Sequence, residues 1–560
     1  MKADLTRNTF RYWKHFTRVL MQQGRVQLDA DWNEQAAILL HFFRSAAFDI
    51  IGPFGRPQAN PGFDIRVLTD LNFPQPSSGD FALSAGHFFV SGILCENTPD
   101  PIVVYSPVLS TTGTTLTVTA ETLSAQGRFL DKGEYLEIFD AANPNAYAFG
   151  VVSDISLATR ALSISIIAGI ADPIIKNSNA QPRARRALTY LRQLDFPMSK
   201  SDIFGTNTTC LIYIDVWERL ITYREDDGIR EIALGGPDTA ARAKLIRQVK
   251  ALQLKPEDTR DFVSLLQDKF QPPNRGYLRA RVRPSLSSTD PCIISPTSRY
   301  RGPENQLYRV EVHTGGSVDP ALGTAIPTFK WSREDGAVTF SILSGGGTAV
   351  VTLDSLGRDD RFGLAEGDWV EVLDDDYVLL NQAGTLLQVL SIDRSTMQVT
   401  LSAPPDNSVG KAPTKHPILR RWDQKQGDET TGGLAFGTDN AALIQESSDD
   451  TGWLDLEDGV QIQFQKFDQS QEQGKLKLQP QYRTGDYWLI PARTATGDVE
   501  WPTQVLKDPQ GNSKKWVIAR PPDGVNHYYA PLGTIDLDQN GQMHNILTPG
   551  SFPASGPHFP

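Results

Sequence analysis

Clusters of acidic residues are the first candidates for chemistry in this sequence. Asp29, Asp31 and Glu34 lie close together, and such carboxylates can hold a divalent cation or serve as acid and base in glycoside cleavage. The same spacing suits a helix N-terminus, with Asp31 as N-cap and Glu34 completing a capping box. The acidic runs Asp374–Asp376 and Asp359–Asp360 are typical of solvated loops. We therefore expect a helix cap at Asp31 and Glu34, and no catalytic or metal-binding acid.

A calcium loop is suggested by Asp536-Leu537-Asp538-Gln539-Asn540-Gly541, which begins like an EF-hand. The twelfth position of an EF-hand requires a bidentate glutamate, and this sequence has Leu547 there. Asn540-Gly541 between two strand-like runs is instead typical of a type I′ hairpin turn. We expect a hairpin here and no metal site.

No standard catalytic signature, such as a Walker loop, an HExxH pair or a GxSxG elbow, occurs in the sequence. The eight histidines are scattered, and Cys95, Cys210 and Cys292 are too far apart to indicate a zinc site or a disulfide framework. We therefore predict a protein that is not an enzyme and has no cofactor. Tryptophans in strand-like runs leave carbohydrate binding as an alternative, and the acidic clusters leave glycoside hydrolysis as a less favoured one.

Composition restricts the partners of the chain. Its 560 residues carry a formal net charge of −12, so the average field repels a phosphate backbone and we expect no nucleic-acid binding. The basic run Arg183–Arg186 fits a solvated loop or salt bridges to a partner. The N-terminus lacks the apolar core of a signal peptide, and the apolar stretch 162–175 is too short to cross a bilayer. We expect synthesis in the cytoplasm, and membrane contact only through partners.

The first element that must position these residues is a helix that ends at Gly52-Pro53. Large apolar residues recur along one face of it at helical spacing, which predicts an amphipathic helix whose apolar face is buried against something. We interpret residues 1–52 as a docking arm that binds either the β framework of its own chain or a neighbouring subunit. The predicted docking residues are Trp32, Leu39, Leu40, Phe43 and Ile50.

Two later stretches resemble each other, which indicates an internal duplication. They are Phe129–Ile138 and Leu364–Val372. In each stretch a turn glycine is followed directly by an acidic residue and then by an aromatic residue. A Thr/Val-rich strand precedes each stretch, and two strand-like runs follow it. About five short strands in this length suit a small Greek-key or SH3-like barrel. We predict duplicated β-barrel modules at about 105–170 and at 341–412.

The rest of the chain is expected to form a larger β framework around these modules. Asp238 can cap a helix that carries Leu245 and Val249 on one face, and a second helix is expected to end near Phe270. The predicted fold is mainly β and multidomain, with an N-terminal helix and a central helical hairpin at about 238–270. The expected domains are the N-terminal helical arm (1–52), a β domain with the first barrel (53–200), a β framework with the helical hairpin (201–340), the second barrel (341–412), the continued framework (413–548) and a flexible tail (549–560).

Several motifs together resemble a family of structural proteins encoded with extracellular contractile injection systems and phage-tail-like particles. The resemblance is nearly full length and rests on Lys2–Arg7, Met21–Gln35, Val216–Arg219, Glu231–Thr239, Glu304–Glu311, Phe329–Arg333 and Gly485–Arg493. The resemblance implies a baseplate or peripheral tail protein that acts by protein–protein assembly, with other tail or baseplate subunits as partners and several copies per particle. It supplies no catalytic residues. A carbohydrate-binding or adhesin-like surface protein is the alternative, and a glycoside hydrolase is less favoured.

Overall fold

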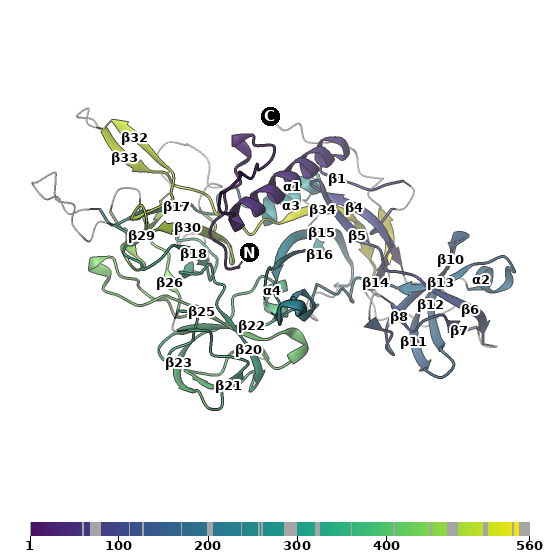
Figure 1. Cartoon of the computed structure of the whole chain (residues 1–560). Coiled ribbons are helices and arrows are strands. Elements are labelled where there is room, and N and C mark those ends of the chain that lie inside the picture. Colours follow the sequence, from purple (N-terminus) through teal and green to yellow (C-terminus); the bar gives the residue numbers. More distant parts are fainter. Residues whose placement is uncertain are drawn as a thin grey trace, which may run out of the picture. The chain divides into compact units, whose positions relative to one another are not determined.

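The computed structural model is mainly β, which confirms the predicted fold class (Figure 1). The chain divides into two compact units, each assembled from three segments. Unit 1 comprises Met1–His41, Trp217–Lys244 and Asp268–Asn526, and unit 2 comprises Phe42–Val216, Leu245–Gln267 and His527–Pro560. The structure describes residues 2–58, 61–67, 80–110, 113–125, 128–169, 171–198, 205–236, 238–255, 258, 261–284, 299–319, 325–359, 361–406, 409–447, 451–466, 480–507, 513–539 and 543–547. The predicted tail at 549–560 lies outside these residues.

The first predicted barrel lies in unit 2 and is closed, with strand order β10-β11-β12-β7-β6-β13. Its strands alternate in burial: along β12 the side chains of Leu162, Ile164 and Ile166 point into the barrel core, while the residues between them are half-buried. A short helix, α2 (Asp172–Lys176), connects the last two strands. The strands are β6 (Ile102–Leu109), β7 (Thr115–Ala120), β10 (Tyr135–Asp140), β11 (Asn143–Ser156), β12 (Ala161–Gly169) and β13 (Pro182–Arg186).

The second predicted barrel lies in unit 1 and is closed in the equivalent order, β22-β23-β24-β21-β20-β25. It therefore repeats the topology of the first barrel, which confirms the duplication. Both barrels are longer than predicted because a sixth strand, β13 or β25, returns to close each of them. The strands are β20 (Thr339–Ser344), β21 (Val350–Leu353), β22 (Trp369–Leu373), β23 (Leu386–Asp393), β24 (Gln398–Leu401) and β25 (Ile418–Trp422), with α4 (Asp375–Leu379) after β22.

Equivalent residues occupy equivalent positions in the two barrels. Glu137 lies opposite Arg185 in the first barrel, and Glu371 lies opposite Arg420 in the second. The turn before β10 and the turn before β22 each contain a glycine with positive φ, a conformation that favours glycine. The basic pair at the end of the run Arg183–Arg186 thus belongs to the repeated barrel pattern, and Arg185 forms a salt bridge of 2.7 Å with Glu137 within the chain.

Unit 2 contains a further four-stranded sheet, β16-β15-β34-β35, whose core includes Ile212, Ile214, Val216 and Leu532. It also contains small sheets next to the first barrel. Strands β15 (Thr208–Ile221) and β16 (Arg242–Gln253) and helix α3 (Phe262–Phe270) have residues in both units. The additional elements of unit 2 are β1 (Phe54–Gly55), β2 (Ile65–Val67), β3 (Phe81–Leu83), β4 (Gly86–Val90), β5 (Ile93–Asn97), β8 (Ser124–Ala125), β9 (Arg128–Phe129), β14 (Leu188–Thr189), β34 (Tyr528–Leu537) and β35 (Met543–Leu547).

The predicted helical hairpin at about 238–270 is wrong in its first half. The segment that Asp238 was expected to cap forms strand β16 and pairs with β15, so Leu245 and Val249 lie on a strand. Hydrogen bonding to a long, buried neighbouring strand has overridden the helical spacing of the apolar residues. The second predicted helix is present in its C-terminal part as α3, and it ends at Phe270 as expected.

The β framework of unit 1 consists of the sheets β26-β19-β18-β30-β31 and β17-β29-β27, with β28 paired to β29. These sheets enclose a core that includes Tyr308, Trp331, Phe464 and Trp488. No helix in the described part of the chain is both long and apolar enough to cross a membrane. The strands are β17 (Leu278–Val282), β18 (Gln306–Val312), β19 (Thr328–Ser332), β26 (Ala442–Leu443), β27 (Glu446–Ser447), β28 (Leu454–Asp455), β29 (Val460–Gln465), β30 (Tyr487–Arg493), β31 (Asp498–Val499), β32 (Thr503–Lys507) and β33 (Ser513–Val517).

Candidate docking site

The N-terminal arm contains the long helix α1 (Asp29–Ile51), which is purple in Figure 1. This helix buries Ala30 and Ile38. The five predicted docking residues lie elsewhere on it and are between 48% and 84% exposed, so their side chains are not covered by the chain's own β framework. We call these residues the docking face: Trp32, Leu39, Leu40, Phe43 and Ile50.

The predicted cap of this helix is wrong in detail. The helix begins at Asp29, so Asp31 lies inside the first turn and is not the N-cap. Glu34 accepts a hydrogen bond from the hydroxyl of Thr9 at 2.6 Å. The carboxylate of Asp29 accepts from the backbone N–H and the hydroxyl of Thr6, at 3.0 and 2.6 Å. These acids therefore hold the preceding chain segment along the helix.

The pKa of Asp29 agrees with its role in holding the preceding chain segment. Partial burial acts to raise the pKa of Asp29, but the hydrogen bonds from Thr6 outweigh it and lower the pKa below its usual value. Farther along the helix, Gln35 accepts a hydrogen bond from the backbone of Val19 at 2.8 Å. The start of α1 is thus tied to residues 6–19, and Asp29, Asp31 and Glu34 form no metal site in the described part of the chain.

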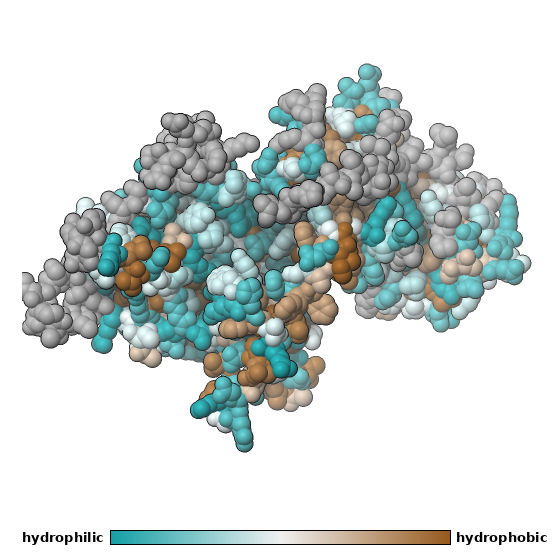
Figure 2. Space-filling view, turned by 90° about the horizontal axis from the view of Figure 1, so that it is seen from above, coloured by the Kyte–Doolittle hydropathy of each residue, from teal (hydrophilic) through white to brown (hydrophobic). Residues whose placement is uncertain are grey.

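The segment between these contacts, residues 10–28, combines exposed apolar side chains with positive charge; we call it the arm loop. It carries four basic side chains and no acidic one, although the whole chain has a net charge of −12. Apart from the short 3-10 turn Tyr12–Lys14 it contains no helix or strand. Its exposed large apolar residues are Tyr12, Trp13, Phe16, Leu20, Met21, Val26 and Leu28. Figure 2 shows that brown hydrophobic patches interrupt the mostly hydrophilic surface of the face drawn in that view.

The beginning of the arm is anchored in a cluster of buried charges in unit 1. The ammonium group of Lys2 lies 2.9 Å from the carboxylate of Glu311 on β18. The backbone N–H of Ala3 donates to Asp335 at 3.3 Å. Asp335 also pairs with Arg309 at 2.9 Å, so both anchoring acids belong to one network.

This buried charge cluster consists of Arg309, Glu311, Lys330, Asp335 and Glu371, which join β18, β19 and the second barrel. Lys330 lies 2.6 Å from Glu371 and 3.5 Å from Glu311, and Arg309 lies 2.6 Å from Glu311. Glu371 also accepts from the indole N–H of Trp422 at 2.9 Å and from the backbone of Gly384 at 2.8 Å. Each charge is matched by a neighbour, so the cluster is suited to fixing structure.

The pKa shifts in the cluster follow from these contacts. Burial acts to raise the pKa of Glu311 and Glu371, yet the neighbouring cations outweigh it and both values are lowered. Burial acts to lower the pKa of Arg309, but Glu311 and Asp335 raise it. Glu311, Glu371 and Arg309 therefore remain charged at neutral pH, whereas burial raises the pKa of Asp335. Sequence analysis missed the cluster, although single charged residues between apolar neighbours in Tyr308–Val312, Phe329–Trp331 and Val370–Val372 were a signal for it.

His313, next to the cluster, predicts a pH dependence. Burial and the nearby Lys330 lower the pKa of His313 from its usual 6.5 to about 4. Between these values the unfolded chain takes up a proton that the folded chain does not, so stability is fully present above pH 6.5 and falls as the pH drops to 4. His313→Asn should flatten the fall, by up to about 3 kcal/mol.

This prediction is checked by thermal unfolding at a series of pH values between 4 and 7. The matched control is His87→Gln, which changes a partly exposed histidine in unit 2. The proton uptake would not belong to His313 if the His313 variant kept the pH profile of the wild-type chain while the control variant changed it.

Comparison with models of known protein families assigns the chain to a family. The sequence model of the family of unknown function (DUF6519) matches residues 1–126 and 270–545. The chain belongs to the DUF6519 family. No curated protein and no solved structure matches the chain.

The matched ranges of the DUF6519 family contain the docking face, the arm loop, the buried charge cluster and the whole second barrel. Strands β10 to β13 of the first barrel lie in residues 127–269, between the two matched ranges. The arm and its anchor therefore belong to the part of the chain that the family model covers, whereas most of the first barrel lies outside that part.

The other acidic runs have structural contacts. Asp374 caps α4 by accepting from the backbone N–H of Tyr377, and Asp375 lies 2.5 Å from Arg219 and 2.7 Å from His416. Asp359 accepts from the backbone of Arg361 and Phe362 within its loop, and Asp360 lies outside the described residues. The predicted solvated loop at Asp374–Asp376 is therefore wrong, because Asp374 is buried as the N-cap and the next two residues begin α4, whereas Asp359 lies exposed in a loop as expected.

The EF-hand-like sequence is part of a hairpin. Strands β34 and β35 pair antiparallel, with Leu537 opposite Met543, and the Asn540-Gly541 turn lies outside the described residues. Cys95 and Cys210 are buried free thiols, and burial raises the pKa of both. Cys292 is outside the described residues.

Proposed function

We propose that the chain is a structural component, either a baseplate or a peripheral tail protein, of a contractile injection system or phage-tail-like particle. Its N-terminal arm binds a neighbouring subunit. The assignment to such a particle rests on the resemblance of the sequence motifs, and the docking role rests on one observation: the docking face is exposed along α1. The anchoring of Lys2 and Ala3 supports this role because it holds the start of the arm on unit 1.

The exposed apolar surface of the arm is large enough for a specific interface. Aromatic side chains bury about 150–250 Å² each, so half-exposed ones leave on the order of 100 Å². The docking face and the arm loop together therefore present on the order of 1,000 Å², above the few hundred Å² that monomers commonly expose. A stable interface needs about 800 Å² from each partner. The arm can supply this area without help from the rest of the chain.

The charge of the arm loop indicates the kind of subunit surface that it fits. Arg11, Lys14, Arg18 and Arg25 accompany the apolar side chains, with no acidic residue among them. The complementary surface would be an apolar groove with carboxylates at its rim, because opposite charges at an interface rim favour encounter and register. A closed symmetric assembly would repeat this contact between several copies of the chain and its neighbours.

The proposal is tested by purifying the particle from cells that produce this chain, and identifying the components by mass spectrometry after density-gradient sedimentation. We expect the chain to sediment with sheath and tube subunits and to remain bound at moderate salt. Recovery of the chain only in the slow-sedimenting fractions, in cells that do produce intact particles, would refute the proposed function.

A further inference from the structure

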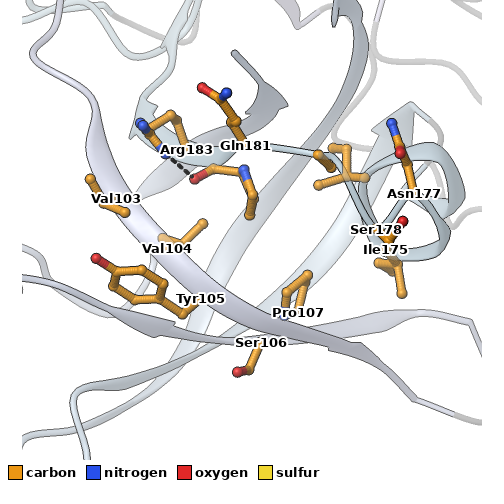
Figure 3. A pocket seen from close by; sticks show the side chains of 13 residues that line it. Val103, Val104, Tyr105, Ser106, Pro107, Ile175, Asn177, Ser178, Gln181 and Arg183 are labelled. Atoms are coloured by element: carbon orange, nitrogen blue, oxygen red, sulfur yellow. Dashed lines mark hydrogen bonds between the residues drawn. The ribbon is translucent and has the colours of Figure 1, made fainter. Parts of the chain in front are cut away.

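A pocket of about 360 Å³ opens on the first barrel. It lies between the outer side of β6, the segment after α2 and the start of β13, and its lining includes Tyr105, Ser106, Asn177, Gln181 and Arg183 (Figure 3). This volume falls at the lower end of the range of small-molecule sites, about 300–1,000 Å³. The site therefore suits a ligand of one or two small rings.

The pocket lies at the seam of the barrel, where β13 pairs with β6. Strand β13 pairs with β6 only at Arg183–Val103 and Ala184–Ile102. In the second barrel the equivalent seam has three pairs, Arg420–Thr339, Leu419–Phe340 and Ile418–Ser341. Beyond Val103 strand β6 turns away through a bulge between Tyr105 and Val108, with Ser106 in a left-handed conformation. The additional pair of the second barrel, Arg420–Thr339, lies at the end of the seam away from the pocket, and at the pocket end both seams stop at equivalent pairs, Arg183–Val103 and Ile418–Ser341.

Arg183 gives the pocket its charge. Its guanidinium donates to the carbonyl of Pro182 at 3.0 Å and, among the described residues, forms no ion pair. By contrast, the neighbouring Arg185 and Arg186 are paired with Glu137 and Glu134. The guanidinium of Arg183 therefore favours a carboxylate ligand, which it can bind through two parallel hydrogen bonds.

The second barrel provides an internal comparison. Because Ala184 and Leu419 hold equivalent positions in the two seams, Arg183 corresponds to Ile418. Ile418 is buried in the second barrel. The arginine is therefore not required by the barrel fold, and its presence at the pocket of the first barrel calls for another explanation.

Tyr105 supplies an aromatic surface beside this charge. Arg183 lies opposite Val103, Tyr105 follows two residues later on β6, and both residues line the pocket. The ring of Tyr105 is about half exposed, at 51%. Ser106, Asn177, Ser178 and Gln181 add neutral hydroxyl and amide groups. An aromatic face, neutral polar groups and one arginine together match a sugar ring that carries a carboxylate.

We propose that the first barrel binds an acidic sugar unit, a hexuronate or a sialic acid, in this pocket. The sugar ring lies against Tyr105, its carboxylate pairs with Arg183, and its hydroxyls bond to the amides of Asn177 and Gln181. This binding goes beyond the proposed assembly role, and the pocket joins β6, inside the matched family range, to the segment after α2 and β13, outside it.

The test is calorimetric titration of the purified full-length chain with glucuronate, galacturonate and N-acetylneuraminate, with glucose as the neutral match. At least one acidic sugar should bind, and glucose should bind at least ten-fold more weakly. Arg183→Gln and Tyr105→Ala should each weaken binding by ten-fold or more, while Arg183→Lys should retain part of it. Arg160→Gln, which changes an exposed arginine elsewhere on the same barrel, is the matched control.

Circular dichroism and thermal unfolding confirm that each variant is folded. Failure of all three acidic sugars to bind the folded wild-type chain would overturn the proposal. Equal binding of glucose, or binding unaffected by Arg183→Gln, would also overturn it. A peptide with a free C-terminal carboxylate, included in the titrations, overturns the sugar assignment if it binds more tightly than every sugar.

Discussion

Replacing both Trp32 and Phe43 with glutamate should abolish incorporation of the chain into its particle while leaving the fold intact. The two side chains are 65% and 73% exposed, so their replacement costs the isolated chain little, within about 0.5 kcal/mol each. At an interface, buried aromatic anchors commonly contribute 2 kcal/mol or more each, so two charges placed there should reduce binding by several orders of magnitude. Incorporation is measured by co-sedimentation with the particle, and folding by thermal unfolding.

The matched control for this pair is the double variant Leu157→Glu with Leu194→Glu. Both leucines are as exposed as the two aromatic residues but lie in turns outside the arm. The control should incorporate normally. Normal incorporation of the Trp32 and Phe43 variant, or equal failure of the leucine control, would show that the docking face has no special role.

The second large effect concerns Lys330, whose replacement with methionine should destabilise unit 1 by about 3–5 kcal/mol. Lys330 is fully enclosed and lies between Glu371 and Glu311, at 2.6 and 3.5 Å. Methionine keeps the length of the side chain but leaves Glu371 without its main cation in a buried site. Because a two-unit chain need not unfold in one step, the effect is measured on the individual transitions of a calorimetric scan.

A double variant separates the lost ion pair from lost packing. Lys330→Met with Glu371→Gln removes both charges and retains an amide that can accept from Trp422. It should recover much of the stability, and the difference from the sum of the single variants gives the coupling energy. A Lys330→Met variant as stable as the wild type would contradict the role given to the buried charge cluster.

The barrels were predictable because their determinants are local. Each module repeats a strand, a glycine turn and alternating apolar residues within a short stretch, and these features indicate a small barrel without help from distant parts. The closing strands β13 and β25 were not predicted because each follows a non-strand connection, and their pairing with β10 and β22 depends on the closed barrel. The sequence was therefore informative about the modules but not about where they end.

Strand β16, by contrast, could not be predicted from its local sequence. Its residues Arg242–Gln253 include many good helix formers, and Leu245 and Val249 have helical spacing. The strand forms because β15 offers a long buried partner, and that partner lies too far away in the sequence to appear in a local pattern. Tertiary hydrogen bonding thus decided an element that local propensity assigned to a helix.

The candidate site was only partly predictable for the same reason. Helical periodicity identified α1 and its apolar residues, but it could not say which part of a wide apolar surface is covered, and Trp32 and Phe43 are exposed while Ile38 is buried. The pairing of Lys2 with Glu311 joins the first and the third segment of unit 1, which are far apart in the sequence. Contacts of this kind depend on the completed fold, so the sequence alone gave only the charges.

If the chain is an assembly component, its arm lies in an interface. A cryo-electron microscopy map of the purified particle would show this interface. We predict symmetry-related copies of the two-barrel chain with Trp32 and Phe43 enclosed by a neighbouring subunit and the arm loop facing carboxylates. A map of an intact particle that lacks this chain, or that contains it with the docking face in solvent, would contradict the proposed assembly role.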